Sequence, residues 1–268
     1  MYSVVNMQEN LSSSIGSNLT APHVLLIGDS CIDKYVSGPV NRISPEAPIG
    51  VLSYVKTEEK EGMASNVLAN LQAFNLFVDP YLSPNRSIKT RYIDSRSNQQ
   101  LLRVDDDRIN SSIKTRTMDL SSYDAIVISD YNKGFVDDTS IIDIIYRFKG
   151  PVFIDTKKKN MSKFEAPHVY LKINSKEAEQ ANTLSNNTII TRGKMGASYA
   201  NIHYAGIPAD VADVTGAGDT FLAALCWGYL HLNNIEEAIK IAIEAASISV
   251  RHHGVYTLTK EDIDEITG

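Results

Sequence analysis

The stretch that decides the fold is Asp213-Val214-Thr215-Gly216-Ala217-Gly218-Asp219-Thr220-Phe221, which lies in the C-terminal part of a chain of 268 residues. It runs into an apolar segment whose large side chains recur at helical spacing, namely Phe221, Leu222, Leu225, Tyr229 and Leu232. The pattern predicts a tight glycine turn that opens a buried helix.

Such a turn has the chemistry of an anion site. The first backbone N–H groups of a helix have no partner within the helix and attract negative charge. Gly216 and Gly218 let the backbone approach a phosphate closely, and the helix dipole favours the ionised form of Asp219. Phosphoryl transfer to a hydroxyl needs a phosphate-binding turn and, next to it, a carboxylate that deprotonates the hydroxyl. An isolated Gly-Ala-Gly-Asp is more often an acid that caps a core helix, so the rest of the chain decides.

Composition narrows the class of protein. With 43% hydrophobic residues the chain can bury a sizeable core, and its net charge of −6 argues against a nucleic-acid-binding surface. Cys31 and Cys226 have no metal-binding spacing and indicate a reducing compartment. Residues 1–20 lack the features of a signal peptide and are expected to form a disordered tail. No run approaches the length of a membrane span, so we expect a cytoplasmic protein without membrane or nucleic-acid partners.

Apolar runs alternate with helical patterns along residues 21–268, and this predicts one α/β domain with a doubly wound, mostly parallel sheet flanked by helices. The expected strands are His23–Gly28, Ala125–Asp130, Val152–Thr156, Val169–Ile173 and Ile189–Thr191. Helices are expected after Asn66, at Thr139–Phe148, from Asn174, at Ile235–His252 and after Thr259. Ser198–Ile207 is expected to form a hairpin. Short alternating stretches at about 34–60 and 88–105, broken by Pro45 and Pro48, predict a small β lid outside the main sheet.

The nine-residue stretch resembles the signature of the ribokinase-like (PfkB) carbohydrate kinases. In that family the second acid, here Asp219, is the catalytic base, and the turn, here Gly216, Ala217 and Gly218, is the anion hole. The strings Arg42-Ile43-Ser44-Pro45-Glu46-Ala47-Pro48 and Lys89-Thr90-Arg91-Tyr92-Ile93 are similar to those of one subgroup, the D-glycero-D-manno-heptose 7-phosphate kinases. The motifs occur in family order from about His23 onward.

The resemblance implies a set of sugar-binding residues: Asp33, Gly62, Asn66, Lys89, Arg91, Gln100, Arg103, Asp130 and Lys133. Simpler interpretations remain open for several of them. Asn66 could be a solvated polar residue early in a helix, and the basic residues near 89–103 could form an ordinary solvated strand face. Met63 stands where the family usually has the second glycine of its lid hinge, which puts free motion at that point in doubt.

The resemblance also implies ATP, Mg²⁺ and a monovalent cation such as K⁺. The expected nucleotide-binding residues are Asn174, Glu177, Thr191, Gly193, Gly196, Thr215, Ala246 and Gly254. Glu177 is expected to order the water shell of Mg²⁺, and Asp213 to bind the monovalent cation. Asn174 and Glu177 also fit a helix capping box, and both roles can hold together.

The sequence therefore predicts an ATP-dependent kinase that phosphorylates the anomeric hydroxyl of a heptose 7-phosphate and dimerises through its lid. The alternatives are another sugar or nucleoside kinase of the family, or a non-catalytic ATP- and sugar-binding homologue. A dehydrogenase is disfavoured because GxGxxG does not follow Gly28, and a P-loop kinase because GxxxxGK[ST] is absent.

The segment Asn75–Ile88 is shorter than the strand–helix–strand unit that family members usually have there. We expect its one strand-like run, at Leu76-Phe77-Val78, to pair beside His23–Gly28, with Asp79-Pro80 forming a turn. Because a sheet loses an element most easily at its edge, we expect the sheet to stop there, one strand short.

Overall fold

The first strand, β1 (His23–Gly28), lies inside the main sheet and shows why the sheet is buried on both faces. The computed structural model describes residues 21–268, so the expected tail at 1–20 lies outside the described residues. Val24 and Leu26 pack into one apolar cluster, and Leu25 and Ile27 pack into a second cluster on the opposite face. A continuous apolar run can fill both layers because successive side chains of a strand point to opposite faces.

The main sheet has eight strands in the order β14-β13-β12-β11-β10-β9-β1-β6. All neighbours from β12 to β6 are parallel, and the β12–β13 and β13–β14 pairs are antiparallel. The strands besides β1 are β6 (Phe77–Leu82), β9 (Ala125–Asp130), β10 (Val152–Thr156), β11 (Val169–Asn174), β12 (Thr188–Thr191), β13 (Ala197–Tyr199) and β14 (Ile202–Tyr204). The predicted doubly wound sheet and the predicted hairpin are confirmed.

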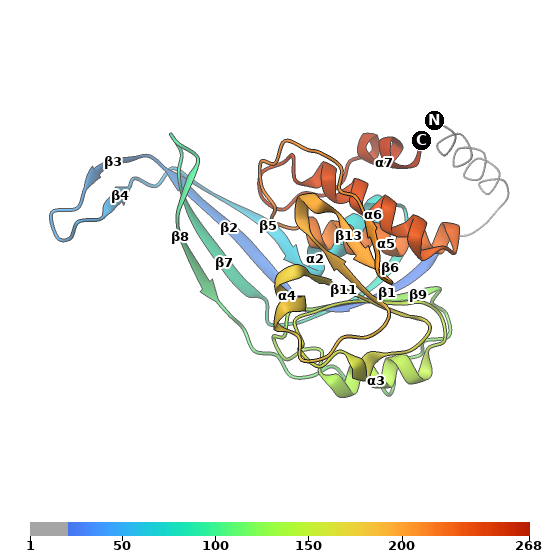
Figure 1. Ribbon diagram of the computed structural model, residues 1–268. Helices are drawn as coiled ribbons and strands as arrows, with labels where there is room; N and C mark the ends of the chain where they lie inside the picture. The colour runs from blue at the N-terminus through green and yellow to red at the C-terminus, as the bar shows by residue number, and fades with distance from the viewer. Residues whose placement is uncertain (1–20) are drawn as a thin grey trace.

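Helices cover both faces of this sheet (Figure 1). One layer holds α2 (Ala64–Ala73), α5 (Ala217–Leu232), α6 (Ile235–Ser249) and α7 (Lys260–Thr267), whose apolar residues join the cluster around Val24 and Leu26. The opposite layer holds α3 (Asp138–Arg147) and the short helix η1 (Ser162–Phe164). The remaining helices, α4 (Ser175–Gln180) and η2 (Gly193–Met195), follow β11 and β12. No helix within residues 21–268 is long and apolar enough to cross a membrane.

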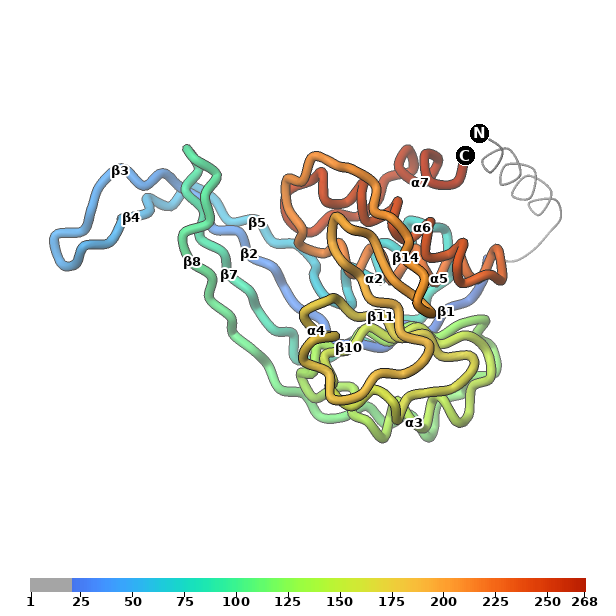
Figure 2. Tube along the Cα trace, viewed as in Figure 1, coloured from blue at the N-terminus to red at the C-terminus, as the bar shows by residue number. Residues whose placement is uncertain are grey.

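A second sheet projects from this body and forms the lid (Figures 1 and 2). Its strand order is β5-β2-β7-β8, built from β5 (Lys56–Met63), β2 (Ser30–Gly38), β7 (Ser87–Asp94) and β8 (Gln99–Asp106). The hairpin of β3 (Val40–Ile43) and β4 (Gly50–Leu52) extends from its far end. The β2–β7 pair is parallel and the other two pairs are antiparallel, so the lid is a mixed sheet.

Two predicted local features need correction. Asp79 and Pro80 do not form a turn but lie inside β6. The α6 helix ends at Ser249 rather than His252, because Arg251 N and His252 N bond to carbonyls only three residues back, at Ile248 and Ser249, and so form turns. Met63 itself has φ 57° and ψ −134°, a conformation that glycine adopts far more easily, so the positive φ at the hinge is reached without a second glycine.

The edge strand explains how Pro80 is tolerated. Phe77 N donates to Pro22 O at 3.0 Å and Ser83 N donates to Gly28 O at 2.9 Å. With the period of two in a strand, the nitrogens of residues 77, 79, 81 and 83 face β1, and Pro80 faces outward, where no ladder donor is needed. Within the described residues no strand pairs with the outer side of β6, as expected for a sheet that stops there.

Amide hydrogen exchange read by NMR should show this edge residue by residue. We expect the N–H groups of Asp79 and Tyr81 to be protected and those of Val78 and Leu82 to exchange quickly, because the latter point away from β1. Equal protection at Val78 and Leu82 would contradict an open edge. The amides of β1, which lies between two strands, are the control.

Candidate functional site

The glycine turn forms the start of α5 as the sequence predicts. Gly216, at φ 82°, is the residue before the helix, and no side chain caps the helix start. A Cβ on Gly216 would lie 2.8 Å from Asn66 Nδ2, and a Cβ on Gly218 would lie 2.7 Å from Lys172 Nζ. The two glycines therefore let an amide and an ammonium group approach the backbone at a helix N-terminus, where anions bind.

Asp219 lies in the first turn of α5 and is 3% exposed. Its Oδ1 accepts a hydrogen bond from the Tyr131 hydroxyl at 2.8 Å, and its Oδ2 accepts one from Asn66 Nδ2 at 3.2 Å. Burial raises the pKa of Asp219 to about 6, against the lowering effect of the Tyr131 hydrogen bond. Such a carboxylate ionises near neutral pH and still binds a proton readily, which suits a general base.

An ion pair that no sequence motif indicated lies beside this carboxylate. Lys172 Nζ and Asp155 Oδ2 are 2.7 Å apart, and both side chains are almost fully buried. They stand at the carboxyl ends of β11 and β10, where ligands bind in open α/β sheets. A lysine inside the apolar strand Val169–Asn174 was the sequence signal that could have identified it.

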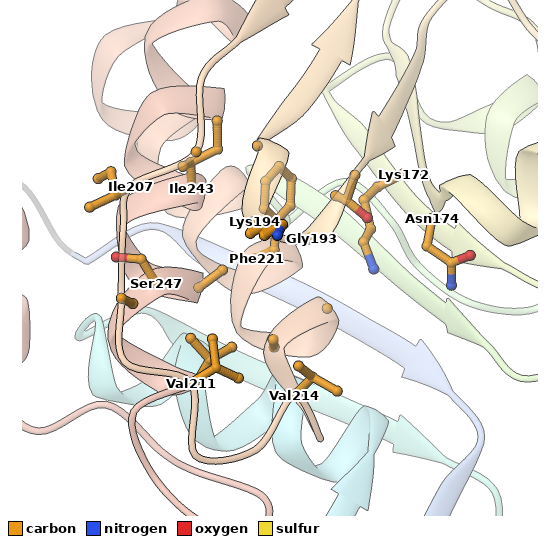
Figure 3. A pocket seen from close by; sticks show the side chains of 18 of the residues that line it. Lys172, Asn174, Gly193, Lys194, Ile207, Val211, Val214, Phe221, Ile243 and Ser247 are labelled. Atoms are coloured by element: carbon orange, nitrogen blue, oxygen red, sulfur yellow. The ribbon is translucent and has the colours of Figure 1, made fainter.

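A cavity of about 450 Å³ opens next to the turn (Figure 3). Ile207, Val211 and Ile243 line its apolar end, and Lys172 and Asn174 lie at the other end. Five of the expected nucleotide-binding residues line the cavity: Asn174, Thr191, Gly193, Gly196 and Ala246.

The other expected nucleotide and metal residues lie around the cavity. Glu177 completes a capping box with Asn174 and also pairs with Lys157, which lines the cavity. Asp213 Oδ1 accepts from Thr215 N and Oγ1, and its Oδ2 accepts from Gly254 N at 2.9 Å. Thr215 and Gly254 are therefore joined through Asp213.

On the lid side, Asp33 is buried and its Oδ1 pairs with Arg91. A Cβ on Gly62 would lie 2.0 Å from Asp33 Oδ2, so only glycine leaves room for this carboxylate. Lys89, from the neighbouring strand, reaches Tyr131 and lies 5.3 Å from the centre of its ring. Asp33 and Lys89 thus lie at the junction of the lid and the body, as Asn66 does.

The remaining expected sugar-binding residues do not point together into one site. Arg103 lies opposite Arg91 in register but pairs with Asp105 at 2.6 Å, and Gln100 lies on the fully exposed strand β8. Asp130 accepts from Thr156 Oγ1 at 2.7 Å, and Lys133 pairs with Asp107 at 2.5 Å. Carboxylates therefore balance much of the positive charge expected in this region.

The titration of Asp219 tests this geometry without any substrate. We expect its carboxyl to titrate with a pKa of about 6, because burial outweighs its hydrogen bonds. Carbon-13 NMR of the aspartate carboxyls, with Asp219→Asn to assign the signal, measures it. A pKa near the ordinary value of 3.8 would contradict the buried position.

Comparison with known proteins agrees with this arrangement. A family model described as pfkB family carbohydrate kinase matches residues 164–262. The chain is 31% identical over 300 residues to the bifunctional protein HldE of a Nitratiruptor species, covering 91% of this chain and 64% of that protein. The corresponding protein of Pasteurella multocida is also 31% identical, with 90% of this chain and 62% of that protein covered. The chain thus spans under two thirds of the length of these relatives.

Solved structures share the fold at low sequence identity. Ribokinase from Thermotoga maritima matches with a TM-score of 0.68 and 17% identity, covering 91% of this chain and 99% of that one. Ribokinase from Arabidopsis thaliana, complexed with ribose and ATP, matches with a TM-score of 0.65 and 16% identity over 92% of this chain and 99% of that one. The chain is thus similar to the pfkB family of carbohydrate kinases over residues 164–262, and it has the ribokinase fold.

Proposed function

We propose that this protein transfers the γ-phosphate of ATP to a sugar hydroxyl, with Asp219 as the general base. The observation that carries the proposal is the buried Asp219 carboxylate, in the first turn of α5 directly beside the uncapped glycine turn and the cavity. A nucleotide phosphate at the turn and a sugar hydroxyl at the carboxylate would meet there. The ribokinase that shares this fold was solved with ribose and ATP.

The proposed reaction needs few covalent steps. Asp219 accepts the proton of the sugar hydroxyl, the oxygen forms a bond to the γ-phosphorus, and the bond to the β-phosphate oxygen breaks to release ADP. In this proposal the N–H groups at the start of α5 and the Lys172 ammonium, which lies close to Gly218, stabilise the charge that develops on the transferring group.

The cavity suits ATP because its two ends differ. An apolar end formed by Ile207, Val211 and Ile243 can hold a purine, and Lys172 and Asn174 stand where phosphates would approach the turn. Its volume lies in the range of small-molecule sites. The curated relatives are bifunctional proteins, and this chain spans under two thirds of their length.

The residues present fit a magnesium ion near the phosphates. Asp155 Oδ1 is buried and has no hydrogen-bond partner among the described residues, and Asp155 lines the cavity. Mg²⁺ favours one or two carboxylates together with phosphate oxygens and water, so Asp155, with Glu177 through water, could hold it. The ion would neutralise phosphate charge. The expected K⁺ fits less well, because Asp213 already accepts three hydrogen bonds, two on Oδ1 and one on Oδ2, and keeps only one lone pair for a cation.

For the acceptor we propose a sugar that already carries a phosphate, with a heptose 7-phosphate phosphorylated at its anomeric hydroxyl as the first candidate. The sequence strings shared with the heptose kinases support this choice, and so does the set of Lys89, Arg91 and Arg103 on paired lid strands. A substrate phosphate would compete with Asp105 for Arg103, whose fork can bind it in a bidentate manner.

We further propose that two copies pair through their lids in the cytoplasm. The hairpin and its flanks expose large apolar side chains, including Ile43 at 70% and Tyr54 at 67%, and β8 exposes Leu101, Leu102 and Val104. Exposed apolar side chains on the lid sheet and on the hairpin that extends from it are typical of an interface. The free cysteines and the use of ATP fit a cytoplasmic protein.

The Asp219→Asn variant should lose on the order of 10²–10⁴-fold in kcat, which is a typical general-base contribution, with ATP binding nearly intact. A coupled assay of ADP release and calorimetric titration of ATP measure the two effects. Asp264→Asn, on the exposed face of α7, is the matched control. Near-normal turnover by Asp219→Asn would show that another group takes the proton.

A screen of ATP consumption over sugars and sugar phosphates, with Mg²⁺ and K⁺ present, tests the substrate. We expect kcat/KM to be at least about 10-fold higher for the heptose 7-phosphate than for unphosphorylated heptose or ribose, because a charge-assisted contact is lost with the phosphate. Arg103→Lys should reduce that preference, whereas Arg116→Lys, at an exposed position, should keep it. Equal use of unphosphorylated sugars would reject the phosphate requirement.

A further inference from the structure

Tyr131 is the first residue after β9, and its backbone is held at a fixed place beside the site. Asp29 Oδ2 accepts hydrogen bonds from Tyr131 N at 2.9 Å and from Lys133 N at 3.1 Å. Asn132, between them, has φ 58°, so the chain turns sharply there. The fully buried carboxylate of Asp29 thus anchors the turn that carries the Tyr131 side chain.

The Tyr131 hydroxyl reaches the proposed base directly. It donates to Asp219 Oδ1 at 2.8 Å, and Asn66 Nδ2 donates to the other oxygen at 3.2 Å. Each oxygen of the carboxylate therefore has its own donor, from a loop on one side and from α2 on the other. Two donors fix the rotation of the carboxylate plane and leave a second lone pair on each oxygen for a substrate proton.

The Tyr131 ring is also the place where the lid meets the body. Lys89 Nζ, from lid strand β7, lies 5.3 Å from the ring centre, and Lys157 Nζ, from the loop after β10, lies 5.0 Å from it. Both distances are in the range of cation–π attraction. One side chain therefore contacts the base and two ammonium groups, one from each part of the molecule.

We propose that Tyr131 is a positioning residue for phosphoryl transfer: its hydroxyl aligns Asp219, and its ring holds Lys89 of the lid beside the reacting groups. This inference rests on the proposed kinase function and adds a residue to it. Tyr131 was not among the residues that the sequence motifs indicated, because its role depends on the packing of β9 against α5 and the lid.

The Tyr131 hydroxyl changes the pKa of Asp219 in one direction. The groups that face Asp219 are Tyr131, Asp155 on β10, Lys172 on β11, Asn66 on α2, and, further away, Lys157 and Cys31. Among them the Tyr131 hydrogen bond lowers the pKa of Asp219. Its removal should raise that pKa, so that a larger fraction of Asp219 is protonated and inactive at neutral pH.

Tyr131→Phe removes the hydroxyl and keeps the ring. We expect kcat to fall on the order of 10-fold, as for loss of one hydrogen bond to a charged group. The KM for ATP should stay within about twofold, since the hydroxyl bonds Asp219 and not the cavity's apolar end. The acidic limb of the kcat–pH profile and the NMR titration of the Asp219 carboxyl should both move to higher pH. Tyr146→Phe, an exposed tyrosine on α3, is the matched control.

Two further variants separate positioning from stability. Replacing Tyr131 by 3-fluorotyrosine makes the phenol a stronger donor, and it should move the Asp219 titration to lower pH. Tyr131→Leu removes the ring as well, and it should also raise the KM for the sugar because Lys89 loses its contact. Shifts of opposite sign in the phenylalanine and fluorotyrosine variants cannot arise from a general loss of stability.

These experiments distinguish a failure of the positioning role from a failure of the proposed kinase function. If the wild-type protein transfers phosphate but Tyr131→Phe leaves kcat and the Asp219 titration unchanged, the positioning role is wrong and the kinase proposal stands. If the wild-type protein transfers no phosphate to any sugar, the proposed function is wrong, and the positioning role fails with it.

Discussion

The site depends on one costly arrangement, the burial of the Asp219 carboxylate at the start of a core helix. A buried carboxylate is unfavourable unless hydrogen bonds and nearby positive charge offset its loss of water. Here Tyr131 and Asn66 donate to it, the helix start faces it, and Lys172 lies close by. The compensation is incomplete, and the pKa of Asp219 remains raised. That imbalance suits the role of general base that we propose for this carboxylate.

The sheet topology brings these partners together from distant parts of the chain. Asp29, Tyr131, Asp155 and Lys172 all stand at or just beyond the carboxyl ends of neighbouring parallel strands. The lid begins at the same edge, because β2 follows β1 after one residue and β5 leads directly into α2. The lid is therefore connected directly to Asn66, which bonds Asp219, and it carries Lys89, which contacts Tyr131.

The parts of the fold that the sequence predicts well are those governed by local pattern. Apolar runs such as His23–Gly28 and the glycine turn at Gly216 appear where expected. The ends of β5 could not be predicted, because Lys56–Met63 is mostly charged and has no apolar pattern. This segment is a strand because it pairs with β2. Pro80 was misjudged because its tolerance in β6 depends on which side of the strand faces outward.

The same distinction holds for the site. Motif residues such as Asn174 and Asp219 could be named from the sequence, but Tyr131, Asp155 and Lys172 are linked to them only by packing.

The central claim is that the turn and Asp219 move a phosphoryl group from nucleotide to sugar. Phosphorus-31 NMR, with the protein in excess over ATP and heptose 7-phosphate present, tests it most directly. We predict that the γ-phosphate signal is replaced, one for one, by a sugar phosphate signal coupled to the anomeric proton. An unchanged γ-phosphate signal, or conversion to inorganic phosphate alone, would contradict the account.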